Sequence, residues 1–195
     1  VAVTKAELPG ADEVQARLAE ALERPILLIS AVTGQGLNQL TNTIARQFDQ
    51  ICAVLVELGY LDAEGQELQV TADGRMLGRL YTDRSLVIAE CLRRGLWQSL
   101  TAPELAACVS ALVFNSRTDE DVVPRLPKGP VREVLAEQVH LWAQIEALER
   151  EFKVNPTAEP DLGFCWAVYQ WASKQSLAAV LAGSDLPAGD FVRWC

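Results

Sequence analysis

The sequence predicts a mainly α-helical protein, in which a helical bundle is preceded by a small β-α-β-α unit with two parallel strands. In the first part, short apolar runs alternate with stripes of apolar residues at helical spacing. From about Ile51, strand-like runs disappear and helical spacing takes over. With 50% hydrophobic and 22% charged residues, the composition is that of a globular protein. We therefore expect two domains, residues 1–48 and residues 49–195.

The first domain should alternate strands and helices. Residues 1–4 form a short apolar strand, and residues 12–22 form a helix that Pro25 ends. The continuous apolar run 25–29 is typical of a strand buried on both faces. A second helix follows, with an apolar stripe made of Leu37, Leu40, Ile44 and Phe48. Because strand and helix alternate, the two strands should be parallel.

One unbroken helix should cross the boundary between the two domains. From Phe48 through Ile51 to Leu55 the apolar spacing is three and then four, so the stripe continues in phase. No Gly or Pro interrupts the chain between Leu37 and Leu58. We expect this helix to end at Gly59, a residue type that favours the left-handed conformation after a helix.

The rest of the chain should form a helical bundle. Thr101, Pro103 and Glu104 together indicate a helix start, because Thr and Glu can cap the free N–H groups and Pro needs no donor there. One short extended piece is expected at 68–71. The expected helices cover residues 74–81, 85–94, 101–114, 131–152 and 164–172, followed by a short pair at 176–181 and 187–194.

Several classes of activity lack their motifs. The phosphate-binding loop of P-loop NTPases is absent, so we expect no nucleotide hydrolysis. We find no catalytic constellation, no metal-ligand spacing and no cofactor motif. No apolar run of about 18 residues is present, which argues against a membrane span. The five cysteines are scattered without a C-x-x-C pair, which favours reduced thiols and a cytoplasmic location.

A local basic cluster is the main candidate site. The formal net charge of -9 opposes strong nucleic-acid binding, because phosphate neutralisation supplies most of that affinity. A patch of arginines could still contact RNA weakly, or form a solvated face paired with Asp73, Asp83 and Glu90. The candidate contacts are Arg75, Arg79, Arg93 and Arg94, beside which Arg84 also lies in the sequence, and Arg193 in the last helix pair.

Three aromatic residues of the predicted helix 164–172 allow two interpretations, nucleic-acid binding or core packing. Trp166, Tyr169 and Trp171 lie close together in the sequence. If exposed, they could stack on nucleic-acid bases. Their helical spacing favours core packing instead.

Residues 1–48 resemble the end of an Obg-type GTPase domain. Residues 4–9 (TKAELP) correspond to a guanine-binding motif, and residues 29–37 (ISAVTGQGL) correspond to the family's last base-contacting loop. Thr4 stands where the family has Asn, and Glu7 where it has Asp. The resemblance implies a guanine-binding remnant made of Lys5, Glu7, Ser30 and Ala31.

Residues from about 48 to the end resemble the C-terminal helical domain, called DSHCT, of exosome-associated DExH RNA helicases. The resemblance is carried, in order, by segments 54–61, 70–81, 86–97, 100–114, 163–172, 176–181 and 189–194. In that family the ATPase motifs lie in RecA-like domains, and the helical domain lies beside the RNA that leaves them. The resemblance therefore implies a RecA-like helicase core and RNA as partners.

The two resemblances meet near residues 46–51, so we expect a fusion of two segments. The main hypothesis is a non-catalytic domain that braces a helicase motor and guides RNA. One alternative is a fragment of a GTP-binding protein of the Obg type. Another is a structural module for protein interaction.

Overall fold

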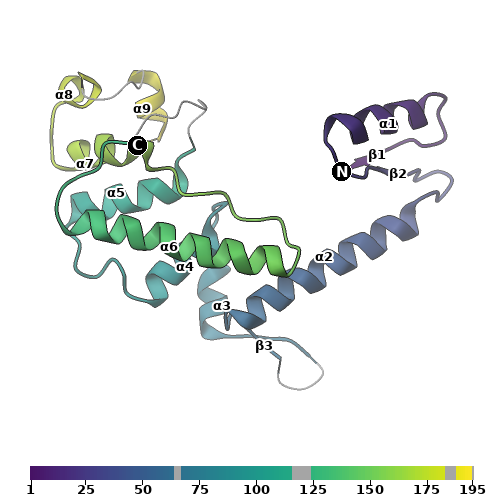
Figure 1. The fold of residues 1–195 in the computed structure, drawn as a ribbon, viewed down its shortest axis with the longest axis horizontal. Helices are drawn as coiled ribbons and strands as arrows, with labels where there is room; N and C mark the ends of the chain where they lie inside the picture. Colours follow the sequence, from purple (N-terminus) through teal and green to yellow (C-terminus); the bar gives the residue numbers. More distant parts are fainter. Residues whose placement is uncertain (64–66, 116–123, 183–187, 195) are drawn as a thin grey trace. The chain divides into compact units, whose positions relative to one another are not determined.

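The computed structural model describes residues 1–63, 67–115, 124–182 and 188–194 (Figure 1). The chain divides into two compact units, Val1–Ala53 and Val54–Cys195. Each unit is described by itself. The domain boundary predicted at residues 48 and 49 lies a few residues before this division, and the origin of each domain stays a prediction.

The first unit contains the expected alternation of strand and helix. Strand β1 (Ala2–Val3) pairs in parallel with β2 (Leu27–Leu28), so that Ala2 lies opposite Leu27. Helix α1 (Ala11–Ala21) connects them. The parallel pairing confirms the prediction, but the strands are shorter than expected. In the run 25–29 only Ile26 is buried, because this described sheet has two strands and cannot cover both faces of β2.

Helix α2 (Leu37–Glu57) is continuous through the predicted boundary. This confirms the expectation of one helix without a break between residues 44 and 54. After it, Gly59 takes a φ of 75° and the Tyr60 N–H donates back to the Leu55 carbonyl, which ends the helix as predicted. The expected burial of the stripe is wrong in part, since Ile44 and Phe48 are exposed.

A second small sheet was missed by the sequence reasoning. Strand β3 (Leu61–Asp62) pairs antiparallel with β4 (Gln69–Val70), where only the second segment was expected to be extended. Helix α3 (Ala72–Leu77) follows at once, and the Thr71 hydroxyl accepts from the Gly74 N–H to cap it. Two-residue strands offer too little period-2 pattern to be distinguished from a turn.

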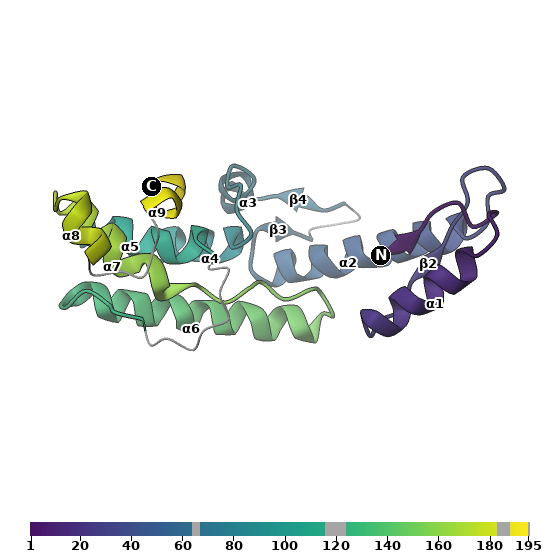
Figure 2. The same cartoon turned by 90° about the horizontal axis from the view of Figure 1, so that it is seen from above.

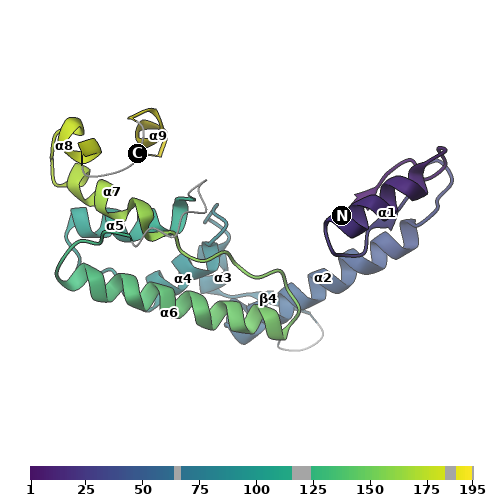
Figure 3. The same cartoon turned by 45° about the horizontal axis from the view of Figure 1, so that its top comes forward.

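The helical bundle agrees with the prediction in the order of its helices. Figures 2 and 3 show α6 running alongside α4 and α5, and α7 lies against α5. Its elements are α4 (Ser85–Arg93), α5 (Ala102–Val113), α6 (Pro130–Glu151), the 3-10 turn η1 (Leu162–Phe164), α7 (Cys165–Ala172), α8 (Leu177–Ala182) and α9 (Ala188–Trp194).

The predicted start of α5 is confirmed in detail. The Thr101 N–H donates to a Glu104 carboxylate oxygen at 2.9 Å, and the two side chains complete a capping box. This bond to Thr101 lowers the pKa of Glu104. Behind the cap, Cys108, Leu112 and their neighbours are fully buried between α4, α6 and α7.

The segment after α6 returns along that helix toward α7 (Figure 3). Glu149, buried on α6, accepts from the Thr157 N–H at 2.6 Å and from its hydroxyl at 2.7 Å. The Trp142 indole N–H donates to the Thr157 carbonyl at 2.8 Å. The Asp161 N–H then donates to the Ala111 carbonyl at 2.9 Å. These bonds fix an irregular segment against the bundle, where its polar backbone would otherwise be left unpaired.

The cysteines give a pH-dependent prediction. Cys91, Cys108 and Cys165 are completely buried, and burial is the main cause that raises the pKa of each thiol from 9.0 to about 12. The unfolded chain releases these protons near pH 9 while the folded chain keeps them. Their stabilising contribution is therefore complete below pH 9 and is lost as the pH rises toward 12.

We expect the melting temperature to fall steadily above pH 9, as measured by tryptophan fluorescence. Replacing Cys108 with alanine should make the fall shallower, because one of the three shifted groups is then missing. A melting temperature that stays constant between pH 8 and pH 11 would contradict this prediction. Cys52 is also buried, and Cys195 lies outside the described residues.

Candidate nucleic-acid interface

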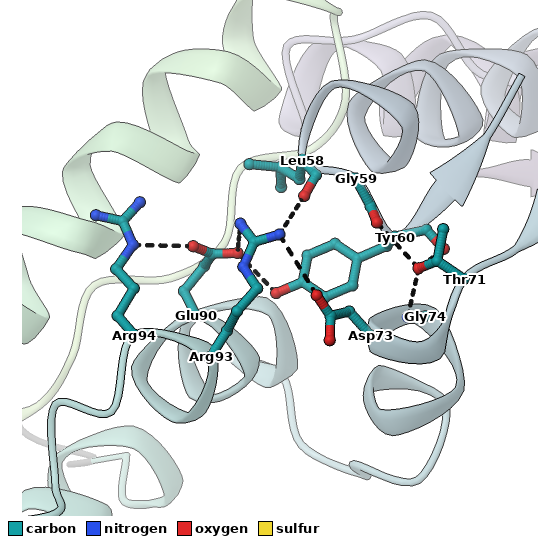
Figure 4. A network of polar contacts seen from close by, with 9 residues as sticks. All are labelled: Leu58, Gly59, Tyr60, Thr71, Asp73, Gly74, Glu90, Arg93 and Arg94. Carbon is teal, nitrogen blue, oxygen red and sulfur yellow. Dashed lines mark hydrogen bonds and ion pairs between the residues drawn. The ribbon is translucent and has the colours of Figure 1, made fainter.

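A buried carboxylate organises half of the predicted arginine cluster (Figure 4). Glu90 is 1% exposed on α4, although it is charged. It accepts from the Tyr60 hydroxyl at 2.7 Å and pairs with Arg93 at 2.6 Å and with Arg94 at 3.1 Å. The arginines lie three and four residues after Glu90, so both reach back to it along one face of the helix.

Arg93 also connects this centre to the turn after α2 and to helix α3 (Figure 4). It donates to the Leu58 carbonyl just after α2 at 2.6 Å, and it lies 3.9 Å from the carboxylate of Asp73 on α3. Its guanidinium lies 5.2 Å from the centre of the Tyr60 ring. Burial alone would lower the pKa of Arg93, but the bond to Glu90 and its other contacts raise it.

This network changes the interpretation of the cluster. Two arginines face two carboxylates, Glu90 and Asp73, so their charges are compensated within the protein. A phosphate would have to compete with contacts that already exist. Arg93 and Arg94 therefore pair with carboxylates, as one of the two alternatives from the sequence expected, but Glu90 is buried rather than solvated.

Arg75 and Arg79 are exposed and differ from this pair. Arg75 donates to the Val70 carbonyl at 3.0 Å, which leaves its charge without a carboxylate partner among the described residues. Arg79 follows α3 and makes no ion pair within the described ranges. Tyr81, two residues further on, is 94% exposed. An exposed ring and two exposed cations within the same seven residues of sequence are the kinds of group that bind single-stranded nucleic acid.

Arg84 is not part of any surface patch, which corrects the sequence analysis. It is 3% exposed, and burial lowers the pKa of its guanidinium. Instead of a phosphate, it binds backbone: it donates to the carbonyls of Phe114 at 3.2 Å and of Glu159 at 2.6 Å. Further bonds go to the oxygens of Leu112, Asn115 and Ala158. Arg84 thereby holds together the start of α4, the end of α5 and the returning segment.

The last helix pair presents one predicted residue to solvent. Arg193 is exposed on α9, whereas Phe191, two residues earlier, is buried. The Phe191 ring lies tilted at 59° to that of Phe164, with 5.6 Å between the ring centres, and edge-on to Trp171 at 5.7 Å. The pair is thus anchored in the bundle core by Phe191. Whether Arg193 contacts nucleic acid stays a prediction.

The residues of the expected guanine-binding remnant come together only in part. Glu7 is exposed, and a hydrogen bond with Ser30 is the main cause that lowers its pKa. Ser30 is fully buried and also accepts from the Thr33 N–H at 3.1 Å. The carboxylate that would accept from guanine therefore has a partner inside the protein. Lys5 and Ala31 are both exposed, and the backbone of Lys5 lies in the left-handed region with a φ of 61°.

The described residues contain neither a group of metal ligands nor a membrane-spanning helix. Among the described residues, no group of three or more potential ligands is placed to hold a metal ion. Within the same residues, no helix combines the length and apolarity needed to cross a membrane.

Most of the helical unit matches a known domain class. Residues 67–195 match the family model described as the DSHCT (NUC185) domain. Because this match covers well over half of the chain, the chain belongs to the DSHCT family. The family expectation from the sequence is thereby confirmed.

Curated relatives are similar over most of the chain. "Probable helicase HelY" from Mycobacterium leprae (strain TN) is 41% identical over 166 residues, covering 80% of this chain and 18% of the relative. The protein of the same description from Mycobacterium tuberculosis (strain ATCC 25618 / H37Rv) is 40% identical over the same length, again covering 80% and 18%. "DExH-box ATP-dependent RNA helicase DExH11" from Arabidopsis thaliana is 26% identical over 146 residues, covering 72% and 10%.

The chain thus spans less than a fifth of the length of these relatives. Residues 49–195 make up about 75% of the chain, so a match over 80% also includes residues before 49. The comparisons do not support the resemblance of residues 1–48 to an Obg-type GTPase domain.

Proposed function

We propose that the chain is the C-terminal helical domain of an ATP-dependent RNA helicase, where it braces a RecA-like motor core and helps to guide RNA. The observation that carries this proposal is the match of residues 67–195 to the DSHCT family, together with relatives described as helicases. The chain itself supplies no catalytic residue and no cofactor in this proposal. The buried thiols are compatible with work in the cytoplasm.

The RNA contact within this function is assigned to the surface around Arg75, Arg79 and Tyr81. The two cations have no carboxylate partner among the described residues, and the ring is almost fully exposed. Arg93 and Arg94 play a structural part instead, because Glu90 already compensates their charges. With a net charge of -9, binding should be weak and sensitive to salt.

The test is the binding of a fluorescent single-stranded oligouridylate, followed by anisotropy at several salt concentrations. The double variant Arg75→Ala with Arg79→Ala should bind more weakly. The slope of log affinity against log salt should become shallower by about 1.4, since each phosphate contact on a single strand contributes about 0.7.

Arg17→Ala with Arg24→Ala is the matched control, because both arginines are exposed and lie in the first unit. It removes the same charge and should leave the slope unchanged. Equal slopes for all three proteins would refute the RNA contact and favour a module for protein interaction.

A further inference from the structure

Arg125 lies over an aromatic ring that is itself stacked on a second one. The guanidinium carbon of Arg125 lies 4.2 Å from the centre of the Trp166 ring on α7. Trp166 is itself stacked with Tyr169, with 5.9 Å between the ring centres and 22° between the planes. Arg125 is exposed, and it makes no ion pair with a carboxylate in the described part of the chain.

The backbone that carries Arg125 is anchored. Leu126 packs against the core cluster that contains Val131, Leu135 and Cys165, and Pro127 is fully buried. Tyr169 packs against the same cluster. Arg125 therefore extends over Trp166 from a fixed position, so little side-chain freedom has to be lost when something binds to it.

Two buried polar atoms accompany the stack. The indole nitrogen of Trp166 and the amide oxygen of Gln170, one helical turn later, are buried and have no hydrogen-bond partner in the part of the chain that the structure describes. An unpaired buried polar group destabilises the folded protein, because its hydrogen bonds to water are lost without replacement. Native proteins keep few such groups, and one of these two belongs to the ring that Arg125 covers.

We propose that Arg125, held over the Trp166 ring, is a stacking platform for a base of single-stranded RNA. A guanidinium that lies on an aromatic ring keeps its outer face free for a base and its N–H groups free for phosphate. Two exposed cations, Lys128 and Arg132, follow within seven residues and could contact the neighbouring phosphates. This inference rests on the proposed RNA-binding function and adds a second contact to it.

A partner protein with a surface carboxylate is the competing occupant, since it would also pair with Arg125. The position of Arg125 over an aromatic ring favours a base, because a carboxylate does not need a ring behind the arginine. The sequence before Arg125 carries Asp119, Glu120 and Asp121, whose charges oppose a purely electrostatic contact. Stacking should therefore supply most of the affinity at this site.

The experiment measures the affinity of the full chain for a fluorescent 20-nucleotide oligouridylate by anisotropy. We expect Arg125→Ala to weaken binding about fivefold or more, the lower end of what one stacked base contributes. Arg125→Lys keeps the charge but not the flat group, and it should lose nearly as much. Arg24→Ala, an exposed arginine in the first unit, should bind like the unmodified chain.

Each other outcome overturns the inference. If Arg125→Ala binds within twofold of the unmodified chain, the stack is only structural. If Arg125→Lys binds normally while Arg125→Ala does not, charge alone acts there. Arg125-dependent binding of an oligoglutamate peptide without any effect on RNA would assign the site to a protein partner.

The result also separates this inference from the proposed function. Loss of binding confined to the Arg75 and Arg79 variant, with Arg125→Ala unchanged, defeats the stacking platform and leaves the proposed function standing. Failure of the unmodified chain to bind RNA at low salt would defeat the proposed RNA contact itself, and the platform with it.

Discussion

Replacing Arg84 with alanine is expected to destabilise the helical unit by ~3 kcal/mol or more, which is among the largest losses for a single polar side chain. Arg84 donates to oxygens of the α5 end and of the segment at residues 158 and 159. Without it these acceptors lose the donor that joins them, and the start of α4 is no longer tied to the returning segment. Arg84→Lys should lose most of the same stability, because an ammonium cannot reproduce the planar fork.

Urea unfolding followed by tryptophan fluorescence measures this loss. All five tryptophans, Trp97, Trp142, Trp166, Trp171 and Trp194, belong to the second unit, so their signal reports on its unfolding. Arg79→Ala is the matched control, because that arginine is exposed and five residues away. It should shift the midpoint little. An Arg84→Ala midpoint equal to that of Arg79→Ala would show that the buried bonds contribute nothing.

The second large effect is expected at Glu90. Glu90→Gln keeps the size of the side chain but removes the charge that holds Arg93 and Arg94. We expect a loss of ~2 kcal/mol, since hydrogen bonds to charged groups are worth about 1.5–3 kcal/mol each and the amide can keep one of them. The bond from the buried Tyr60 hydroxyl is the one that an amide oxygen can still accept.

The same urea measurement tests this prediction. Glu137→Gln, an exposed acid on α6, provides the charge-matched control and should be nearly neutral. If both variants unfold at the same urea concentration, the carboxylate at position 90 is not the centre of a stabilising network.

Long periodic elements of this fold were predictable, and short ones were not. The stripe through Phe48 and Ile51 is long enough to specify α2, and the Thr101 cap fixes the start of α5 by local chemistry. The β3–β4 hairpin depends on pairing between Leu61 and Val70, and only the second of its two-residue strands was indicated by the sequence. The exposure of Ile44 followed from the small size of the first sheet, which periodicity does not report.

The candidate site also contains some residues that a local sequence pattern indicates and others whose partners are far away in the sequence. Glu90 inside an apolar helix, with arginines three and four residues later, is a local pattern that could have indicated a buried ion pair. Arg84 gave no such warning, because its acceptors are backbone carbonyls up to 75 residues away. The pairing of Arg125 with Trp166 joins residues that are also distant in sequence and only becomes visible in three dimensions.

The central claim, that this DSHCT chain contacts RNA, is tested most directly by mapping where RNA touches it. A 4-thiouridine oligonucleotide is crosslinked to the chain with light, and the linked peptides are identified by mass spectrometry. The account predicts crosslinks at residues 75–81 and at Trp166 or its neighbours, reduced by Arg75→Ala with Arg79→Ala and by Arg125→Ala respectively. Crosslinks confined to residues 1–53, or none above those of a non-binding control protein, would contradict it.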